Sequence, residues 1–241
     1  MADSNKLVFL DTETTGNDVA SDRLCQVCYK VDGKVYTQNF KPPVPISTKA
    51  MSITHITNKM VEGEAPFMGS DFEKTLKPIL AENILVAHNA RFDIAMLKAE
   101  GVEVPRHICT LRLVRYLDSE GEIPEYNLQY LRYHYGIELE ADAHSAEGDV
   151  LVLEAVFEHL YTLAAEKSKT DSRDEIIERM IDISSTPTLI KRFTFGKCAG
   201  QLVADVAKTD RSYLEWFLRT KLADDPDDED WIYTLQRALG N

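Results

Sequence analysis

The sequence LVFLDTETTG occupies residues 7–16 and is the most informative stretch of the chain. Its first four residues are apolar, as expected for a buried strand, and the strand runs into two acidic residues, Asp11 and Glu13. Because side chains alternate between the two faces of a strand, these carboxylates point the same way and can share one divalent cation or bridge two. The stretch therefore predicts a sheet whose first strand carries a pair of metal ligands.

Such a pair suits phosphodiester cleavage. Two metal ions about 3.5–4 Å apart can stabilise the attacking and the leaving oxygen of an in-line displacement, and a bridging carboxylate holds that spacing. The Asp-x-Glu spacing also occurs by chance, so the hypothesis depends on support from the rest of the chain.

A second acidic position follows another apolar run. The segment HNARFD spans residues 88–93, comes after the apolar residues 84–87, and opens a stretch with helical periodicity. Asn89 is the expected N-cap of this helix. Asp93 lies four residues further on, in the first turn, where a carboxylate is close to the positive end of the helix.

A third acidic position belongs to the segment HSAEGD, residues 144–149. An apolar stripe with helical spacing follows it, so the sequence predicts a helix over 145–165. Asp149 falls in the early turns of that helix and His144 in the loop before it. Four acids and one histidine thus come from three separate ends of strands or helices.

The motifs D-x-E-T-T-G, H-N-x-x-F-D and H-x-x-x-x-D occur in this order, each at a predicted element boundary. Together they resemble the three exonuclease motifs of the DEDDh (DnaQ-like) superfamily of 3′-to-5′ exonucleases, over residues 5 to about 165. The resemblance implies an α/β, ribonuclease H-like exonuclease fold, with a five-stranded mixed sheet and helices on both faces.

The resemblance also implies the roles of the site residues. Five are catalytic, four as ligands of two Mg²⁺ ions and the last as general base: Asp11, Glu13, Asp93, Asp149 and His144. Magnesium prefers oxygen ligands, and Mn²⁺ is expected to substitute for it. A histidine with an ordinary pKa of about 6.5 can be neutral near physiological pH and so accept a proton. Five further residues are implied to contact the substrate: Thr14, Thr15, His55, Asn89 and Phe92.

Two of the histidines have structural alternatives. His55 either satisfies a turn or lies near the substrate, and the sequence leaves both open. His88 is expected to be a structural histidine at a strand end, because Asp93 already supplies the chemistry of its motif.

The C-terminal part of the chain resembles the small C-terminal module of exonuclease X-like proteins, through FTFGK at residues 193–197 and the tail 231–239. One interpretation is a nucleic-acid clamp that uses Lys191, Arg192, Lys197 and Trp216. The other, which we favour, is a compact module whose core contains Phe193, Phe195, Tyr213 and Trp216. The further basic residues expected after Gly196-Lys197 are absent here, which weakens the first interpretation.

The predicted organisation has three parts: an exonuclease domain over 5–165, a helical linker over 166–186 and the C-terminal module over 187–241. Within the first part we expect a hairpin through Asp32-Gly33 and a series of helices and short strands. The expected ranges are strands 23–31, 34–40, 84–88 and 106–109, and helices 57–63, 68–81, 90–100, 110–118, 127–135 and 145–165.

Composition sets the outer limits. The chain has 241 residues, is 44% hydrophobic and has a net charge of −13. No signal peptide and no membrane-spanning run are recognisable, so we expect a cytoplasmic protein without a membrane partner. The four cysteines, Cys25, Cys28, Cys109 and Cys198, are expected to be free thiols, since residues three apart on a strand face opposite sides.

The acidic balance is unusual for a protein that binds nucleic acid. Six acidic residues crowd into 224–230, which we interpret as a solvated loop. Four more belong to the metal site. We therefore expect weak, salt-sensitive binding of an end-acting enzyme.

Three functional hypotheses follow. The first is a Mg²⁺-dependent 3′-to-5′ exodeoxyribonuclease that acts on single-stranded or duplex DNA 3′ ends, releases nucleoside 5′-monophosphates and works in DNA repair. The second is a 3′-to-5′ exoribonuclease, because one sequence does not reveal the pocket that would accept a 2′-hydroxyl. The third is a non-catalytic subunit that binds partners, which the intact acids argue against, since they repel one another without metal.

Overall fold

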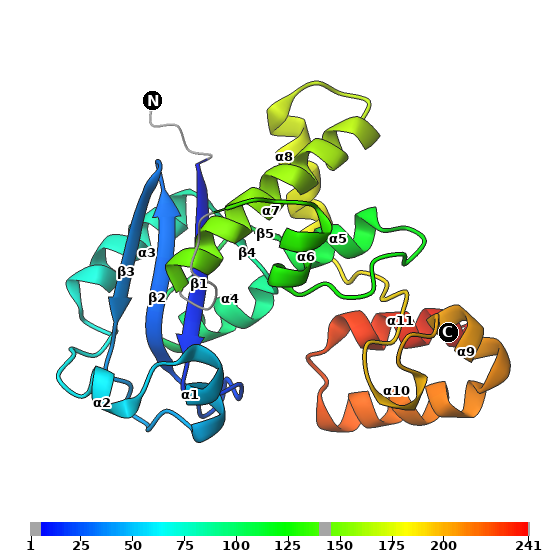
Figure 1. Cartoon of the computed structure of the whole chain (residues 1–241), viewed down its shortest axis with the longest axis horizontal. Helices are drawn as coiled ribbons and strands as arrows, with labels where there is room; N and C mark the ends of the chain where they lie inside the picture. Colours follow the sequence, from blue (N-terminus) through cyan, green and yellow to red (C-terminus); the bar gives the residue numbers. More distant parts are fainter. Residues whose placement is uncertain (1–5, 140–145, 241) are drawn as a thin grey trace. The chain divides into compact units, whose positions relative to one another are not determined.

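We describe residues 6–139 and 146–240 of a computed structural model of the chain (Figure 1). The chain divides into two compact units, one of residues 1–110 with 132–159 and one of residues 111–131 with 160–241. Residues 111–131 thus cluster with the C-terminal part of the chain. The predicted domain limits at 165 and 186 stay a prediction, because compactness does not define evolutionary modules.

The first unit is built on a five-stranded mixed sheet in the order β3-β2-β1-β4-β5. Its strands are β1 (Leu7–Thr14), β2 (Leu24–Val31), β3 (Lys34–Asn39), β4 (Ile84–Ala87) and β5 (His107–Cys109). β1 pairs antiparallel with β2 and parallel with β4. The β2–β3 hairpin turns at Asp32 and Gly33, both with positive φ, as the sequence predicts. The predicted α/β fold with a five-stranded mixed sheet is confirmed.

The two faces of the sheet are covered by different helices (Figure 1). Phe9 of β1 packs edge-on against Phe157 of α7 (Ala146–Lys167), with ring centroids 5.4 Å apart. On the other face Tyr29 of β2 packs against Phe72 of α3 (Asp71–Glu82), at 5.3 Å. Residues of β1 with odd numbers therefore face α7, and those with even numbers face away from it.

The remaining helices of the first part of the chain are short. They are α1 (Thr48–Thr54), α2 (Asn58–Val61), α4 (Ala90–Ala99), α5 (Thr110–Leu117) and α6 (Leu128–His134). The sequence did not predict α1, which follows a proline-rich segment and is only seven residues long. Its N-cap is Ser47, whose side chain accepts a hydrogen bond from the backbone of Ala50.

The second unit contains helices α8 (Arg173–Ser184), α9 (Val203–Thr209), α10 (Arg211–Asp224) and α11 (Glu229–Leu239), with a short 3₁₀ turn at Gly196–Cys198. Its core includes Phe193, which is fully buried, and Trp231. Phe195 and Trp216, however, are 45% and 51% exposed. The predicted aromatic core is therefore right for Phe193 and wrong for these two.

The acidic run 224–230 is only partly the solvated loop that we expected. Asp228 caps α11 and pairs with Lys221. Asp230 is buried and contacts the guanidinium groups of Arg112 and Arg115, at 3.0 and 2.7 Å. The prediction is wrong for these two acids, because their cationic partners lie far away or on another helix and leave no local pattern.

No helix within residues 6–139 and 146–240 is both long and apolar enough to cross a membrane.

Candidate active site

Asp11 and Glu13 lie at the C-terminal end of β1, on the face of the sheet that α7 covers. The strand register pairs Asp11 with Cys28 and Glu13 with Gln26 on β2. Both acidic side chains are half-buried. The alternation predicted from the sequence is therefore present, and the two carboxylates project toward the helix that carries the third motif.

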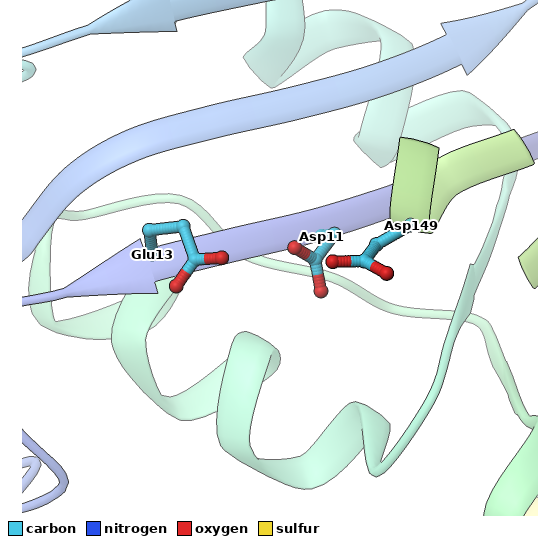
Figure 2. A group of neighbouring side chains, drawn as sticks. All are labelled: Asp11, Glu13 and Asp149. Carbon is cyan, nitrogen blue, oxygen red and sulfur yellow. The ribbon is translucent and has the colours of Figure 1, made fainter. Parts of the chain in front are cut away.

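Asp149 completes a group of three. It lies in the first turn of α7, and each of Asp11, Glu13 and Asp149 offers a carboxylate oxygen within 4.8 Å of the others (Figure 2). Figure 2 shows the carboxylates of Asp11 and Asp149 turned toward each other beside β1. Residues 138 positions apart thus converge because α7 packs on the odd-numbered face of β1.

Asp93 approaches the strand differently. It lies in the first turn of α4 and is 4% exposed. Its Oδ1 accepts hydrogen bonds from the hydroxyl of Thr12, at 2.7 Å, and from the backbone N–H of Thr12, at 3.2 Å. Asp93 is therefore next to the three acids but outside the group whose oxygens all lie within 4.8 Å.

Burial and the proximity of like charges raise the pKa values of the acids in this site. Burial, followed by repulsion from Asp93, Glu13 and Asp149, raises the pKa of Asp11 well above its usual value. Burial and repulsion from Asp149 and Asp93 raise the pKa of Glu13 to about 7. Burial also raises the pKa of Asp93, while the hydrogen bond from Thr12 lowers it in part. A cation bound between these acids would reduce their mutual repulsion, so the arrangement favours cation binding.

The donor set fits a hard divalent ion. Its atoms are all carboxylate oxygens, which are the ligands that Mg²⁺ and Mn²⁺ prefer, whereas zinc sites favour histidine and cysteine. Cys28 lies beside Asp11 in the register, but burial raises the pKa of its thiol to about 11, and its sulfur accepts a hydrogen bond from Thr37. Among the described residues, the group whose ligand atoms lie within 4.8 Å of one another consists of Asp11, Glu13 and Asp149 and does not include this thiol.

His144, the predicted general base, falls outside the described residues. The described part of α7 begins at Ala146, two residues later. Its role thus stays a prediction from the sequence.

Thr15 stabilises the loop between β1 and β2 through hydrogen bonds to Asp22 and Arg23. Its hydroxyl donates to Asp22 at 2.7 Å and accepts from the backbone N–H of Arg23, while its own N–H bonds to the Arg23 carbonyl. A Cβ at position 16 would lie 2.4 Å from Asp22 Oδ2, so a larger residue than Gly16 would displace this carboxylate from Thr15. Thr14 donates to the Gly16 carbonyl at 2.6 Å. The predicted substrate contacts of Thr14 and Thr15 stay predictions, and in this structure both side chains hold the loop.

The other predicted substrate residues lie at helix ends. Asn89 occupies the N-cap position of α4, as predicted, but it has φ 63° and makes no side-chain capping bond. Phe92 is half-buried in the first turn of α4. His55 is exposed and ends α1 in the left-handed region, at φ 58°. Their contacts with substrate stay predictions.

His88 Nδ1 and the Thr110 hydroxyl share a hydrogen bond of 2.9 Å, as expected for a structural histidine. The four cysteines are buried and none of them forms a disulfide, in agreement with the prediction from the sequence. Sequence reasoning missed the link between Thr12 and Asp93, which are 81 residues apart. The only local signal was the position of Thr12 between the two acids of its motif.

Comparisons with known proteins agree with this arrangement. The family model described as Exonuclease, of the RNase T type, matches residues 8–157, which contain all three motifs. The chain belongs to this exonuclease family. A second model, described as Exodeoxyribonuclease X-like C-terminal, matches residues 193–220 of the exonuclease.

Among curated proteins, Exodeoxyribonuclease 10 of Escherichia coli (strain K12) is 30% identical to this exonuclease over 214 residues, which cover 87% of this chain and 89% of the relative. DNA polymerase III subunit epsilon of Treponema pallidum is 31% identical over 160 residues, 61% of this chain and 72% of the relative. The resemblance to exonuclease X-like proteins, drawn from the motifs, is confirmed.

Solved structures share the fold. "Exonuclease X in complex with 5′ overhanging duplex DNA" superposes with a TM-score of 0.57 at 25% identity, covering 74% of this chain and 99% of that one. A complex of E. coli ExoI with single-stranded DNA, in a zinc-bound form, gives the same TM-score at 20% identity, over 73% of this chain and 42% of that one. The ribonuclease H-like exonuclease fold and the DEDDh class of 3′-to-5′ exonuclease are thereby established.

Proposed function

We propose that this exonuclease is a divalent-metal-dependent 3′-to-5′ exodeoxyribonuclease that shortens DNA from its 3′ end to nucleoside 5′-monophosphates. The observation that carries the proposal is the group of three carboxylates, Asp11, Glu13 and Asp149, with Asp93 beside it. DNA is favoured over RNA because the relatives similar over the largest share of this chain are named exodeoxyribonucleases.

Asp11, Glu13, Asp149 and Asp93 are the residues that would hold the cations, with Mg²⁺ as the proposed metal, Mn²⁺ as its substitute and two ions as the proposed number. When bound, divalent ions lower the pKa of water and stabilise charge on the leaving 3′ oxygen. Burial and repulsion from Asp149 and Asp93 raise the pKa of Glu13 to about 7, and this supports the assignment, because a bound cation would offset both effects and favour the charged carboxylate.

The proposed role of His144 is to accept the proton of the attacking water. Its support is the sequence motif, with Asp149 five residues later at the start of α7. A neutral imidazole near pH 7 suits that task, and general bases of this kind contribute about 10²–10⁴-fold to the rate. Thr14, Thr15, His55, Asn89 and Phe92 are proposed to contact the terminal nucleotide. The cytoplasmic location and a part in DNA repair also belong to this proposal.

The test compares degradation of a 5′-labelled single-stranded DNA oligonucleotide and its RNA counterpart, with Mg²⁺, with Mn²⁺ and with EDTA. We expect a DNA ladder that shortens from the 3′ end, disappears in EDTA and is slowed at least about a hundredfold in His144→Ala. His88→Ala is the matched control, because the ring of His88 forms a hydrogen bond with the Thr110 hydroxyl, and the variant should retain most of the activity wherever it folds.

Other results would redirect the proposal. Faster loss of RNA than of DNA would support the exoribonuclease hypothesis. No shortening of either substrate with either metal would contradict the proposal and leave the partner-binding subunit. Equal rates for His144→Ala and the unaltered protein would remove the general base from the mechanism.

A further inference from the structure

Thr12 lies between the two acids of the first motif, Asp11 and Glu13, and is not itself a carboxylate ligand. It is 7% exposed, and both of its donors, the hydroxyl and the backbone N–H, reach the same oxygen, Asp93 Oδ1, at 2.7 and 3.2 Å. Such a pair of bonds fixes the position of a buried carboxylate more strictly than one bond does.

The sheet explains why this contact exists. β4 pairs with β1 at residues 7–9, and Thr12 lies three residues beyond that ladder. A buried backbone N–H needs a partner, since leaving one unmade costs about 1–3 kcal/mol. The carboxylate of Asp93, on the helix that follows β4, takes the place that a longer β4 would occupy. Because β4 ends before Thr12, the position of Asp93, the fourth acid of the site, is determined by its hydrogen bond with the Thr12 backbone.

The alternation of β1 keeps this acid apart from the other three. Asp11 and Glu13 face α7, so the side chain of Thr12 faces the opposite way. Asp93, bound to Thr12, correspondingly lies outside the group of three oxygens within 4.8 Å. Yet it is close enough to Asp11 for repulsion between the two to be felt.

We propose that Thr12 is a positioning residue that anchors Asp93 through Oδ1, so that the other carboxylate oxygen, Oδ2, is the one presented to a divalent cation. This inference rests on the proposed function, because it needs the acids to bind metal. It makes the threonine of the D-T-E triplet part of the metal site without being a ligand. Residues that orient a ligand in this way affect metal affinity about 10–100-fold when they are replaced.

The test measures Mn²⁺ binding to the full chain by titration calorimetry, thermal unfolding without metal, and degradation of the DNA oligonucleotide. Thr12→Val keeps the shape and removes the hydroxyl, whereas Thr12→Ser restores it. Thr110→Val is the matched control: Thr110 is fully buried, and its hydroxyl bonds to His88 and to the Ala87 carbonyl.

We expect Thr12→Val to weaken Mn²⁺ binding about tenfold or more and to slow degradation at subsaturating metal, while Thr12→Ser stays within about threefold of the unaltered protein. Thr110→Val should lose thermal stability and keep its Mn²⁺ affinity. Binding unchanged in Thr12→Val, or lost equally in the serine variant or in Thr110→Val, would overturn the inference.

Failure of the proposed function has a different signature. If the unaltered protein bound no Mn²⁺, or bound it as well after Asp11→Asn, the acids would not be a metal site at all. If the unaltered protein bound Mn²⁺ and cleaved DNA but did not respond to Thr12→Val, only the role of Thr12 would fall.

Discussion

Asp11 in the first unit is a half-buried acid and Asp230 in the second is a buried one, but their neighbours have opposite charges. Asp11 faces Glu13 and Asp149. Asp230 is held by Arg112 and Arg115 and accepts a hydrogen bond from the backbone N–H of Thr188 at 3.0 Å. A buried charge is tolerated where the protein itself supplies the opposite charge, and it indicates a binding site where the protein supplies more of the same.

The largest expected effect removes an acid from the uncompensated group. Asp11→Asn should lower the rate of DNA degradation about a thousandfold, equivalent to about 4 kcal/mol of transition-state stabilisation, because metal binding and its charge stabilisation are lost. Without metal the variant should unfold at a temperature no lower than the unaltered protein, since one source of repulsion is gone. The rate of DNA degradation measures the loss of activity, and thermal unfolding in EDTA measures the stability without metal. A variant that loses both activity and folding would contradict the comparison.

The opposite pattern, a loss of stability with activity retained, is expected at Asp230, whose charge is compensated by two arginines. Asp230→Ala removes the buried carboxylate from Arg115 and from Arg112, whose side chain is 4% exposed and keeps only the half-exposed Glu229 as an acidic partner. Breaking a buried ion pair from one side costs about 3–5 kcal/mol. Chemical denaturation should show this loss. Activity of the folded fraction at low temperature should stay within about twofold, and a selective loss of activity in a fully folded variant would show that Asp230 serves the site.

Protonation gives a smaller effect with a definite sign. The pKa of Glu13 is about 7 in the folded protein, above its ordinary value of 4.5, so the folded state binds more protons than the unfolded state between these pH values. Stability without metal should therefore fall as pH rises from about 4.5 to 7, by on the order of 1–3 kcal/mol, and level off above that window. Unfolding in EDTA across pH measures the slope. Glu13→Gln should make the slope smaller without abolishing it, because the pKa values of Asp11 and Asp93 are raised as well. A slope of opposite sign would contradict the raised pKa of Glu13.

The smallest effect is expected on the surface of the C-terminal module. Lys197 is exposed, pairs with Asp210 at 2.8 Å and lies 4.3 Å from the centre of the Tyr213 ring. If the module is not a nucleic-acid clamp, Lys197→Ala should change the affinity for DNA less than about twofold and the unfolding free energy by less than about 1 kcal/mol. Binding measured at several salt concentrations tests this. A marked loss of affinity together with a shallower salt dependence would restore the clamp interpretation.

Local patterns predicted the parts of this molecule that depend on neighbours in sequence. Alternation placed Asp11 and Glu13 on one face, and helical periodicity placed Asp149 in the first turn of α7. The five-stranded mixed sheet followed from the resemblance that these motifs carry. Such signals are visible because the residues that create them lie within a few positions of one another.

Contacts between distant residues were not predictable. Arg115 and Asp230 are 115 residues apart, and Thr12 and Asp93 are 81 apart. The acidic run 224–230 was therefore interpreted from its composition, without its partners. Helix α1 was missed because it is short, and the expected capping bond of Asn89 is replaced by a left-handed backbone.

The burial of the four cysteines has a practical consequence for labelling. Cys25, Cys28, Cys109 and Cys198 are each at most 5% exposed, and burial raises the pKa of Cys25 to about 12. Maleimide reagents attack the thiolate of an accessible cysteine, so the native thiols should react slowly. A single cysteine introduced at an exposed position such as Glu62 would then carry a fluorophore alone, without removal of any native cysteine.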